Sequence, residues 1–168
     1  KRAELLEKEE KRAKIAREND VLGAVVANAE VEIPDVMVER QIDRMLKDFE
    51  YRLSMQGISL ENYVKYSGLE VKAMRADMKD DAASRVKSQL VLEAVTKAEG
   101  VKAESAEVDE RIDEYVKQFG ERAEEFKKTI GEHDRSFFEE QAVIENTIRL
   151  LVDSAVEVEK APAAQAAE

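Results

Sequence analysis

The chain is 168 residues long with a formal net charge of −11 at pH 7, a length that allows one ordinary domain and a charge that opposes binding to nucleic acid. It contains no cysteine, which excludes disulfides and thiolate metal sites and fits a reducing, cytoplasmic setting. Charged residues make up 39% and aromatic residues 5%, with six glycines and two prolines, so we predict an all-α fold of long amphipathic helices.

The first predicted helix runs over residues 2–28 and has one apolar stripe and a charged reverse face. Residues 30–33 are predicted to be an extended connection, because the residue before a proline is biased away from helix. Pro34 suits the first turn of the next helix, which is predicted over residues 35–56 and ends before Gly57. Its apolar stripe consists of Val38, Ile42, Met45, Phe49 and Leu53.

A short helix and a long helix are predicted next. Ser59 is the expected N-cap of the short helix, which closes at Ser67 and Gly68. The long helix is predicted over residues 70–98, with Gly100 just past its end. Its inward-facing residues are predicted to be Val71, Met74, Met78, Ala82, Val86, Leu90, Val91 and Val95.

The following segment is predicted to form two helices separated by a glycine. Ser105 is the expected cap of the first, which stops at Gly120, and the second covers residues 122–130. The apolar stripe of the first consists of Val108, Ile112, Tyr115, Val116 and Phe119.

The last helix is predicted over residues 136–156. Ser136 and Glu139 have the spacing of a capping box, in which each side chain accepts from the other residue's backbone N–H. Residues 159–168 are rich in Ala with Pro, Gln and Glu, which predicts a disordered tail. No apolar stretch is long enough for a signal peptide or a membrane span, so we expect no membrane partner. No Met begins the chain, so we expect it to be a fragment.

The sequence contains an internal repeat with an offset of seventy positions. The identical pairs include Val38 and Val108, Ile42 and Ile112, Asp43 and Asp113, Lys47 and Lys117, and Phe49 and Phe119. A unit made of a helix end, a connector and an amphipathic helix is therefore present twice, near residues 21–56 and 91–130. The repeat predicts two similar helical arms rather than one compact bundle.

Residues that could support catalysis are few. The single histidine, His133, lies in a predicted polar turn, where we expect an exposed side chain, and the helical di-metal pattern fails because position 130 is isoleucine. No glycine-rich phosphate loop is present. Adjacent carboxylates such as Asp80 and Asp81 are expected in a chain with 38 acidic residues. We therefore expect no enzymatic activity, no cofactor and no metal.

Apolar side chains on the predicted helices are the remaining candidates for function. Methionine suits contacts with varied partners because its side chain is unbranched, flexible and polarizable. The alternative for each of these residues is an ordinary core position at helical spacing. The candidates include Met37, Met45, Met55, Met74 and Met78, together with Phe49, Tyr51, Phe119 and Phe126.

Two adjacent segments, residues 28–34 and residues 38–45, closely resemble the C-terminal domain of bacterial trigger factor. Further similar segments follow in the same order along the chain. They are residues 57–63, 85–95, 99–101, 108–110 and 119–120. The resemblance runs over residues 1–158, which we interpret as one such domain.

The resemblance implies an elongated helical body with two protruding arms, which belongs to a ribosome-associated, ATP-independent chaperone that cradles nascent chains. It implies that unfolded or nascent polypeptides are the partners, and it allows a weak homodimer. The family's ribosome-docking domain and prolyl isomerase domain have no counterpart in these residues, so we expect ribosome contact only through the missing N-terminal domain. The residues implied in client binding are Met45, Phe49, Tyr51, Met55, Tyr115, Val116, Phe119 and Phe126.

Two other interpretations remain open on the residues alone. A structural helical scaffold without client binding would also show long apolar stripes and dense surface charge. The stripes, however, mix spacings of three and four and are interrupted by glycines, so they do not sustain the strict heptad of a long coiled coil. A helical enzyme would need chemistry from carboxylates alone, which makes it the weaker alternative.

Overall fold

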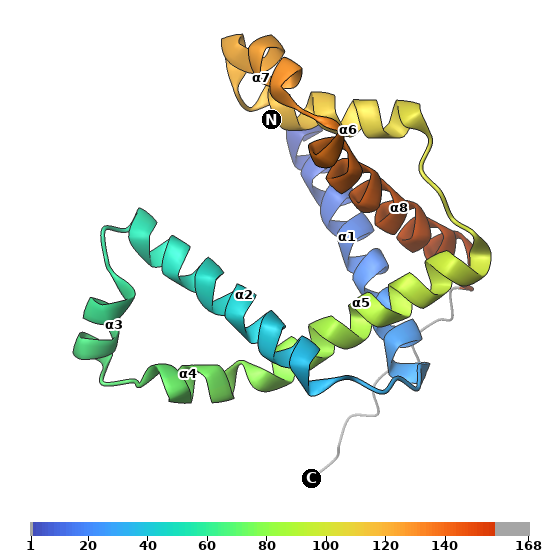
Figure 1. Cartoon of the computed structure of the whole chain (residues 1–168). Helices are drawn as coiled ribbons and strands as arrows, with labels where there is room; N and C mark the ends of the chain where they lie inside the picture. Colours follow the sequence, from blue (N-terminus) through green and yellow to red (C-terminus); the bar gives the residue numbers. More distant parts are fainter. Residues whose placement is uncertain (1, 157–168) are drawn as a thin grey trace. The chain divides into compact units, whose positions relative to one another are not determined.

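The computed structural model describes residues 2–156, apart from the side chains of residues 2–5 and 133. The described residues contain helices and no strand (Figure 1), which confirms the all-α prediction. The predicted tail and the predicted exposure of His133 lie outside the described residues and side chains. The helices are α1 (Arg2–Asn28), α2 (Asp35–Met55), α3 (Leu60–Ser67), α4 (Val71–Asp77), α5 (Lys79–Glu99), α6 (Ser105–Lys117), a 3-10 turn η1 (Gly120–Arg122), α7 (Ala123–Thr129) and α8 (Glu132–Ser154).

The chain divides into two compact units. Among the described residues, unit 1 contains the beginning of α1, up to Ala24, and the chain from Val101 onward, whereas unit 2 contains residues 25–100. Each unit has its own small apolar core. The expected body with two arms therefore stays a prediction.

The core of unit 2 lies between α2 and α5. Val38 and Ile42 of α2 are buried against Ala82 of α5, which has no exposed surface. Spacings of four place Val38 and Ile42 on one face of α2, and the small Ala82 side chain lets the two helices approach closely. The partly buried residues around this contact are Ile33, Met45, Met78 and Ala83.

The turns of unit 2 follow the predicted caps closely. Gly57 adopts a φ of 75°, a left-handed conformation that favours glycine, directly after α2. The Ser59 hydroxyl oxygen accepts a hydrogen bond from the Asn62 backbone N–H at 3.2 Å, so Ser59 caps α3 as predicted. Pro34 precedes α2 as its N-cap rather than lying inside the first turn.

The prediction of a single long helix over residues 70–98 is wrong, because Met78 separates α4 from α5. The Met78 N–H still donates to the Met74 carbonyl at 3.1 Å, and the Ala82 N–H donates to the Met78 carbonyl at 2.9 Å. The chain therefore bends with these helical hydrogen bonds in place. Asp80 and Asp81 lie in the first turn of α5, where negative charge favours a helix start.

The core of unit 1 lies between α6 and α8. Val108, Ile112 and Val116 of α6 pack against Ala142 of α8. Thr147 of α8 is fully buried, and its hydroxyl donates to the Val143 carbonyl one turn earlier at 2.8 Å, which satisfies the buried group within the helix.

Two predicted caps in unit 1 are wrong. The N-cap of α6 is Glu104, whose backbone N–H donates to the Glu107 carboxylate at 2.9 Å, so Ser105 lies inside the first turn. Helix α8 begins four residues before Ser136, at Glu132, where the Asp134 carboxylate accepts from the Gly131 N–H at 3.1 Å. In both cases a carboxylate near the helix start replaces the serine, because charge-assisted bonds are stronger and anions favour that end of a helix.

The two units are built as copies of one helix pair. Val38 and Val108, and Ile42 and Ile112, occupy equivalent positions in the seventy-residue repeat, and all four side chains are buried. The helices that pack against this repeated stripe are α5 and α8. Their alanines, Ala82 and Ala142, lie sixty positions apart, and each is buried against the valine and isoleucine of its own unit. The connection between the paired helices is therefore ten residues shorter in unit 1.

We expect each core to stabilise its own unit. Replacing Ile42 by alanine should lower the free energy of unfolding of unit 2 by about 2–5 kcal/mol, because a buried branched side chain leaves a cavity. Hydrogen exchange would then speed up in α2 and α5. Ile112→Ala should likewise destabilise unit 1 and speed hydrogen exchange in α6 and α8.

The exposed Ile15 of α1 offers a matched control, since Ile15→Ala should change stability by less than about 0.5 kcal/mol. Equal acceleration of exchange in both units after a single core substitution would contradict the presence of separate cores.

Candidate functional site

Five aromatic residues of unit 1 form what we call the aromatic cluster. Phe119 stacks on Phe126 with ring centroids 4.1 Å apart and planes at 16°, whereas Tyr115 meets Phe138 at 5.4 Å. Phe137 meets Phe138 edge-on at 5.7 Å. Offset-stacked and edge-to-face pairs are the favourable geometries for aromatic rings, so the five side chains support one another.

The fold brings the cluster together through one reversal of the chain. Tyr115 and Phe119 are four residues apart at the end of α6 and lie on one face. Gly120 then adopts a φ of 56°, which a residue with a side chain rarely does. The reversal folds α7 back onto α6 and lays Phe126 against Phe119.

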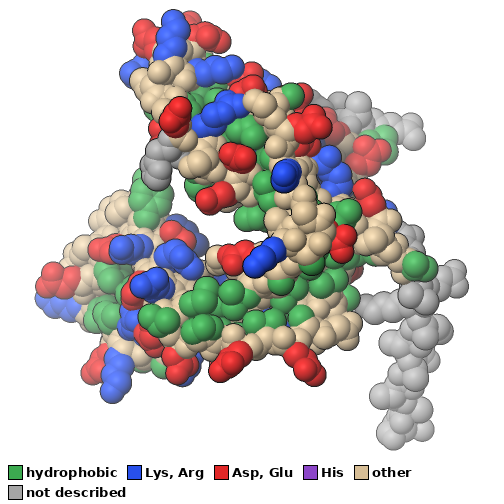
Figure 2. Space-filling view, turned by 45° about the vertical axis from the view of Figure 1, so that its right-hand side comes forward, with side chains coloured by type: hydrophobic (Ala, Val, Ile, Leu, Met, Phe, Trp, Pro, Cys, Tyr) green, Lys and Arg blue, Asp and Glu red, His purple; other side chains and the backbone are tan. Residues whose placement is uncertain are grey.

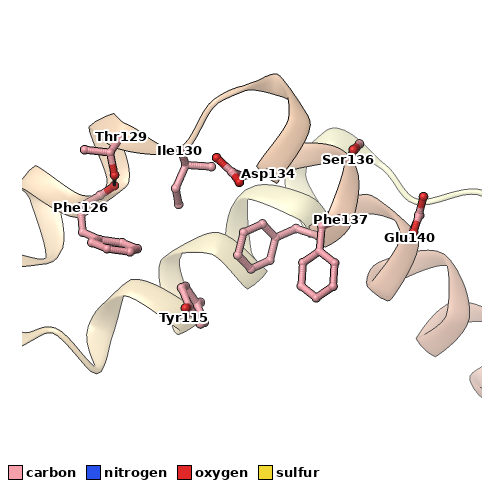
Figure 3. A pocket seen from close by; sticks show the side chains of 9 residues that line it. Tyr115, Phe126, Thr129, Ile130, Asp134, Ser136, Phe137 and Glu140 are labelled. Atoms are coloured by element: carbon pink, nitrogen blue, oxygen red, sulfur yellow. Dashed lines mark hydrogen bonds between the residues drawn. The ribbon is translucent and has the colours of Figure 1, made fainter. Parts of the chain in front are cut away.

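An open cavity of about 670 Å³ lies beside the aromatic cluster. Figure 3 shows Tyr115 projecting from α6, with Phe126 and Phe137 on either side of it. Ile130 closes the apolar lining, whereas polar groups occupy other parts of the wall. Its polar residues are Thr129, Asp134, Ser136 and Glu140. The volume lies in the range typical of ligand pockets, roughly 300–1,000 Å³.

The rings of the cluster remain accessible to a partner. Phe137 is 58% exposed, and Tyr115 is 44% exposed. Phe119 and Phe126 are each exposed by more than a third. A contiguous group of exposed apolar side chains beside a hollow is characteristic of an interaction site.

Ion pairs tie the elements around the cavity to α6. The Arg135 guanidinium of α8 donates to the Asp109 carboxylate at 2.5 Å and to the Ser105 hydroxyl at 2.8 Å. The Lys127 ammonium of α7 pairs with the Asp113 carboxylate. The hydrogen bond from Arg135 lowers the pKa of Asp109, and the bond to Asp113 raises the pKa of Lys127.

Unit 2 has an equivalent but simpler arrangement. Phe49, at the repeat position of Phe119, meets Tyr63 of α3 edge-on at 5.1 Å. A single cation, Arg75 of α4, donates to the Asp43 carboxylate at 2.6 Å and to the Glu39 carboxylate at 2.7 Å.

The residues expected to bind clients occupy different surroundings. Tyr115, Phe119 and Phe126 come together in the aromatic cluster. Val116 is only 4% exposed and belongs to the core of unit 1, so it is not available to a partner. It follows Val108 and Ile112 at spacings of four and faces α8, whereas Tyr115 lies on the neighbouring face.

The expected residues of unit 2 are more dispersed. Tyr51 and Met55 are exposed, at 65% and 72%, near the end of α2. Met45 packs at the edge of the core, and Phe49 is half-buried against Tyr63.

Sequence reasoning missed the polar lining of the cavity and three apolar residues of the site: Ile130, Phe137 and Phe138. The adjacent pair Phe137 and Phe138 was a usable signal, because neighbouring residues of a helix point about 100° apart and both rings could not fit one narrow core stripe. Phe138 is partly buried against the core, and Phe137 is left exposed.

The described part of the chain contains no group of three or more His, Asp or Glu side chains placed to hold a metal ion. None of the helices in residues 2–156 is long and apolar enough to cross a membrane.

The fold and the site define an all-helical module made of two related helix pairs, with a ligand-sized cavity in unit 1 whose apolar lining is mainly aromatic. A family model described as bacterial trigger factor protein C-terminus matches residues 1–153, and the chain belongs to this family. The family resemblance found in the sequence is thereby confirmed.

Known relatives are trigger factors. That of Clostridioides difficile is 37% identical over 154 residues, which are 92% of this chain and 36% of that protein. That of Bacillus subtilis is 44% identical over 126 residues, 70% of this chain and 30% of that protein. The chain thus spans about a third of the length of these relatives.

A solved structure of trigger factor domains from Thermotoga maritima has a similar fold. Its TM-score is 0.59 at 18% sequence identity, with 85% of this chain and 83% of that chain covered. At that identity the match supports the fold.

Acid should weaken the contact between α6 and α8. Because Arg135 lowers the pKa of Asp109 below the unfolded value of about 3.9, the stabilising contribution is present above that value and is lost as pH falls through the folded pKa. We therefore expect Asp109→Asn to reduce the dependence of stability on pH below about pH 4. Urea unfolding at a series of acidic pH values measures this. Asp48→Asn, at an exposed position of α2, is the charge-matched control, and an equal effect of both substitutions would contradict the interpretation.

Proposed function

We propose that this chain is the polypeptide-binding part of a molecular chaperone, which holds unfolded or nascent segments reversibly and without nucleotide. The observation that carries the proposal is the aromatic cluster, exposed beside an open cavity in a chain of net charge −11. Membership of the trigger factor C-terminal family supports it.

The size of the exposed apolar surface fits weak, reversible binding. An aromatic side chain offers roughly 150–250 Å² in total, and burial of apolar surface contributes about 25 cal/mol per Å². A ring such as Tyr115, 44% exposed, would therefore contribute on the order of 2 kcal/mol when covered. The entropic cost of association and ordering offsets much of the sum over the cluster. The expected affinity is low and tolerant of sequence.

Unit 2 would add a second, more scattered apolar surface. Tyr51 and Met55 are the most accessible of the residues assigned to it, and the flexible thioether of Met55 can repack against different side chains. Figure 2 shows acidic and basic side chains mixed over the visible face, with apolar side chains gathered between them. Such mixed charge keeps the chain soluble while apolar patches stay open.

The proposed activity is binding rather than catalysis, in the cytoplasm. Contact with the ribosome is assigned to parts of the relatives that these residues do not match, and a weak homodimer is compatible with the proposal. The family's prolyl isomerase activity is likewise not assigned to these residues.

A scaffold role is the second candidate, and α1 is the element that favours it. Residues 6–17 of α1 are exposed throughout, and salt bridges such as Lys11–Glu7 and Arg12–Glu9 connect successive turns. A helix segment that is exposed on all sides and stabilised by charge pairs between its turns suits a connecting or assembling part. Sedimentation that finds an obligate oligomer, with no suppression of client aggregation, would favour this role.

Suppression of aggregation of a chemically denatured client, without nucleotide, tests the chaperone proposal. We expect the chain to suppress aggregation and Phe137→Ser to weaken suppression roughly fivefold, because a largely exposed apolar ring of the cavity wall is lost. Phe119→Ser should act in the same direction.

The control is Tyr66→Ser in α3, which removes an aromatic ring that is 85% exposed and lies outside the aromatic cluster. Helical content measured by circular dichroism must stay unchanged in all three variants. Equal loss of suppression in Tyr66→Ser and Phe137→Ser would speak against the cavity as the binding site.

A further inference from the structure

Helix α7 is the least anchored wall of the cavity. It has seven residues, and none of them is buried. Helices this short are marginal in water without tertiary support. Its N-cap, Arg122, makes no side-chain capping hydrogen bond, and glycines at positions 120 and 131 lie before and after the segment.

Apolar contacts and an ion pair hold α7 on α6. Phe126 stacks on Phe119 and also meets Tyr115, and Ala123 packs against the core of unit 1. The ion pair joins Lys127 to Asp113, and we call it the α7 tether. Both side chains of the tether are partly exposed, at 39% and 47%, so water and salt reach the pair. Such a pair is strong enough to bias a position and weak enough to open.

The comparison of the two units shows how the tether differs from its counterpart. In unit 2, Arg75 binds both acids of the repeat, Glu39 and Asp43, and thereby joins α4 to α2. In unit 1 the equivalent acids, Asp109 and Asp113, bind different cations. Arg135 pairs with Asp109 and thereby joins α8 to α6, whereas Lys127 of α7 pairs with Asp113. In unit 1 the joint between the paired helices and the contact that holds α7 therefore use different cations.

We propose that α7 is a movable wall, which swings away from α6 as a unit and opens the aromatic cavity, with the α7 tether setting how often it opens. Phe126 and Thr129 of α7 line the cavity, so their displacement widens it from one side (Figure 3). The core of α6 and α8 stays packed during this motion, because its buried residues belong to α6 and α8 and α7 adds only the partly buried Ala123 at its first position. The inference rests on the proposed function in so far as the cavity receives clients.

Hydrogen exchange of the whole chain, followed by mass spectrometry, tests the movable wall. We expect Lys127→Gln and Asp113→Asn to speed exchange in α7 about two- to fivefold, with α6 and α8 unchanged, because a partly exposed ion pair is lost. Lys128→Gln is the matched control, since it removes the same charge from the same last turn of α7 at an exposed position.

Two further readouts separate the tether from a general structural effect. Added salt should speed α7 exchange in the wild-type chain and leave Lys127→Gln unaffected, because screening acts on the pair. The charge-reversed double variant, Asp113→Lys with Lys127→Asp, should restore slow exchange. Equal exchange in Lys127→Gln and Lys128→Gln, or acceleration throughout unit 1, would overturn the proposal.

Binding of a short apolar peptide that contains tryptophan tests the link to the cavity. The chain has no tryptophan, so the fluorescence of the peptide reports binding directly. We expect its affinity to change about two- to fivefold in Lys127→Gln and to stay constant in Lys128→Gln. If the peptide binds all three chains equally, the movable wall does not control the site. If it binds none while α7 exchange still responds, the proposed function fails and the movable wall stands.

Discussion

Each unit depends on one close contact, in which an alanine of one helix faces a stripe of valine and isoleucine on another. Ala82 and Ala142 are almost completely buried. A larger side chain at either position would hold the helices apart, since the distance between packed helices follows the side chains at the contact. Arg135 reaches Asp109 across the α6–α8 contact, whereas Arg75 lies on α4 and pairs with Glu39 and Asp43 of α2.

The difference between the units arises around this shared contact. In unit 2 one arginine pairs with both acids of the repeat, whereas in unit 1 an arginine pairs with one of the equivalent acids and a lysine with the other. The lysine belongs to α7, which the chain folds back after Gly120. The same helix pair thus carries only an aromatic pair in unit 2 and an aromatic cluster with a cavity in unit 1.

Much of the fold followed from the sequence. Apolar spacing, glycines at helix ends and the cap at Ser59 predicted most helices and their boundaries, because these signals act within a few residues. The break at Met78 and the starts of α6 and α8 were missed. At the starts of α6 and α8 several polar residues could cap the helix, and contacts between distant residues, such as Arg135 with Ser105, also act there. The break at Met78 carries no side-chain cap that the sequence could have indicated.

The sequence by itself determined the helical class, the repeat and the family, and it identified aromatic residues of the site such as Phe119 and Phe126. Only the tertiary structure decided which face of each helix is covered. It buried Val116, left its neighbour Tyr115 exposed, and added Phe137 and Phe138 to the site. The physical reason is that helical periodicity defines a face, whereas the partner that covers this face comes from a distant part of the chain.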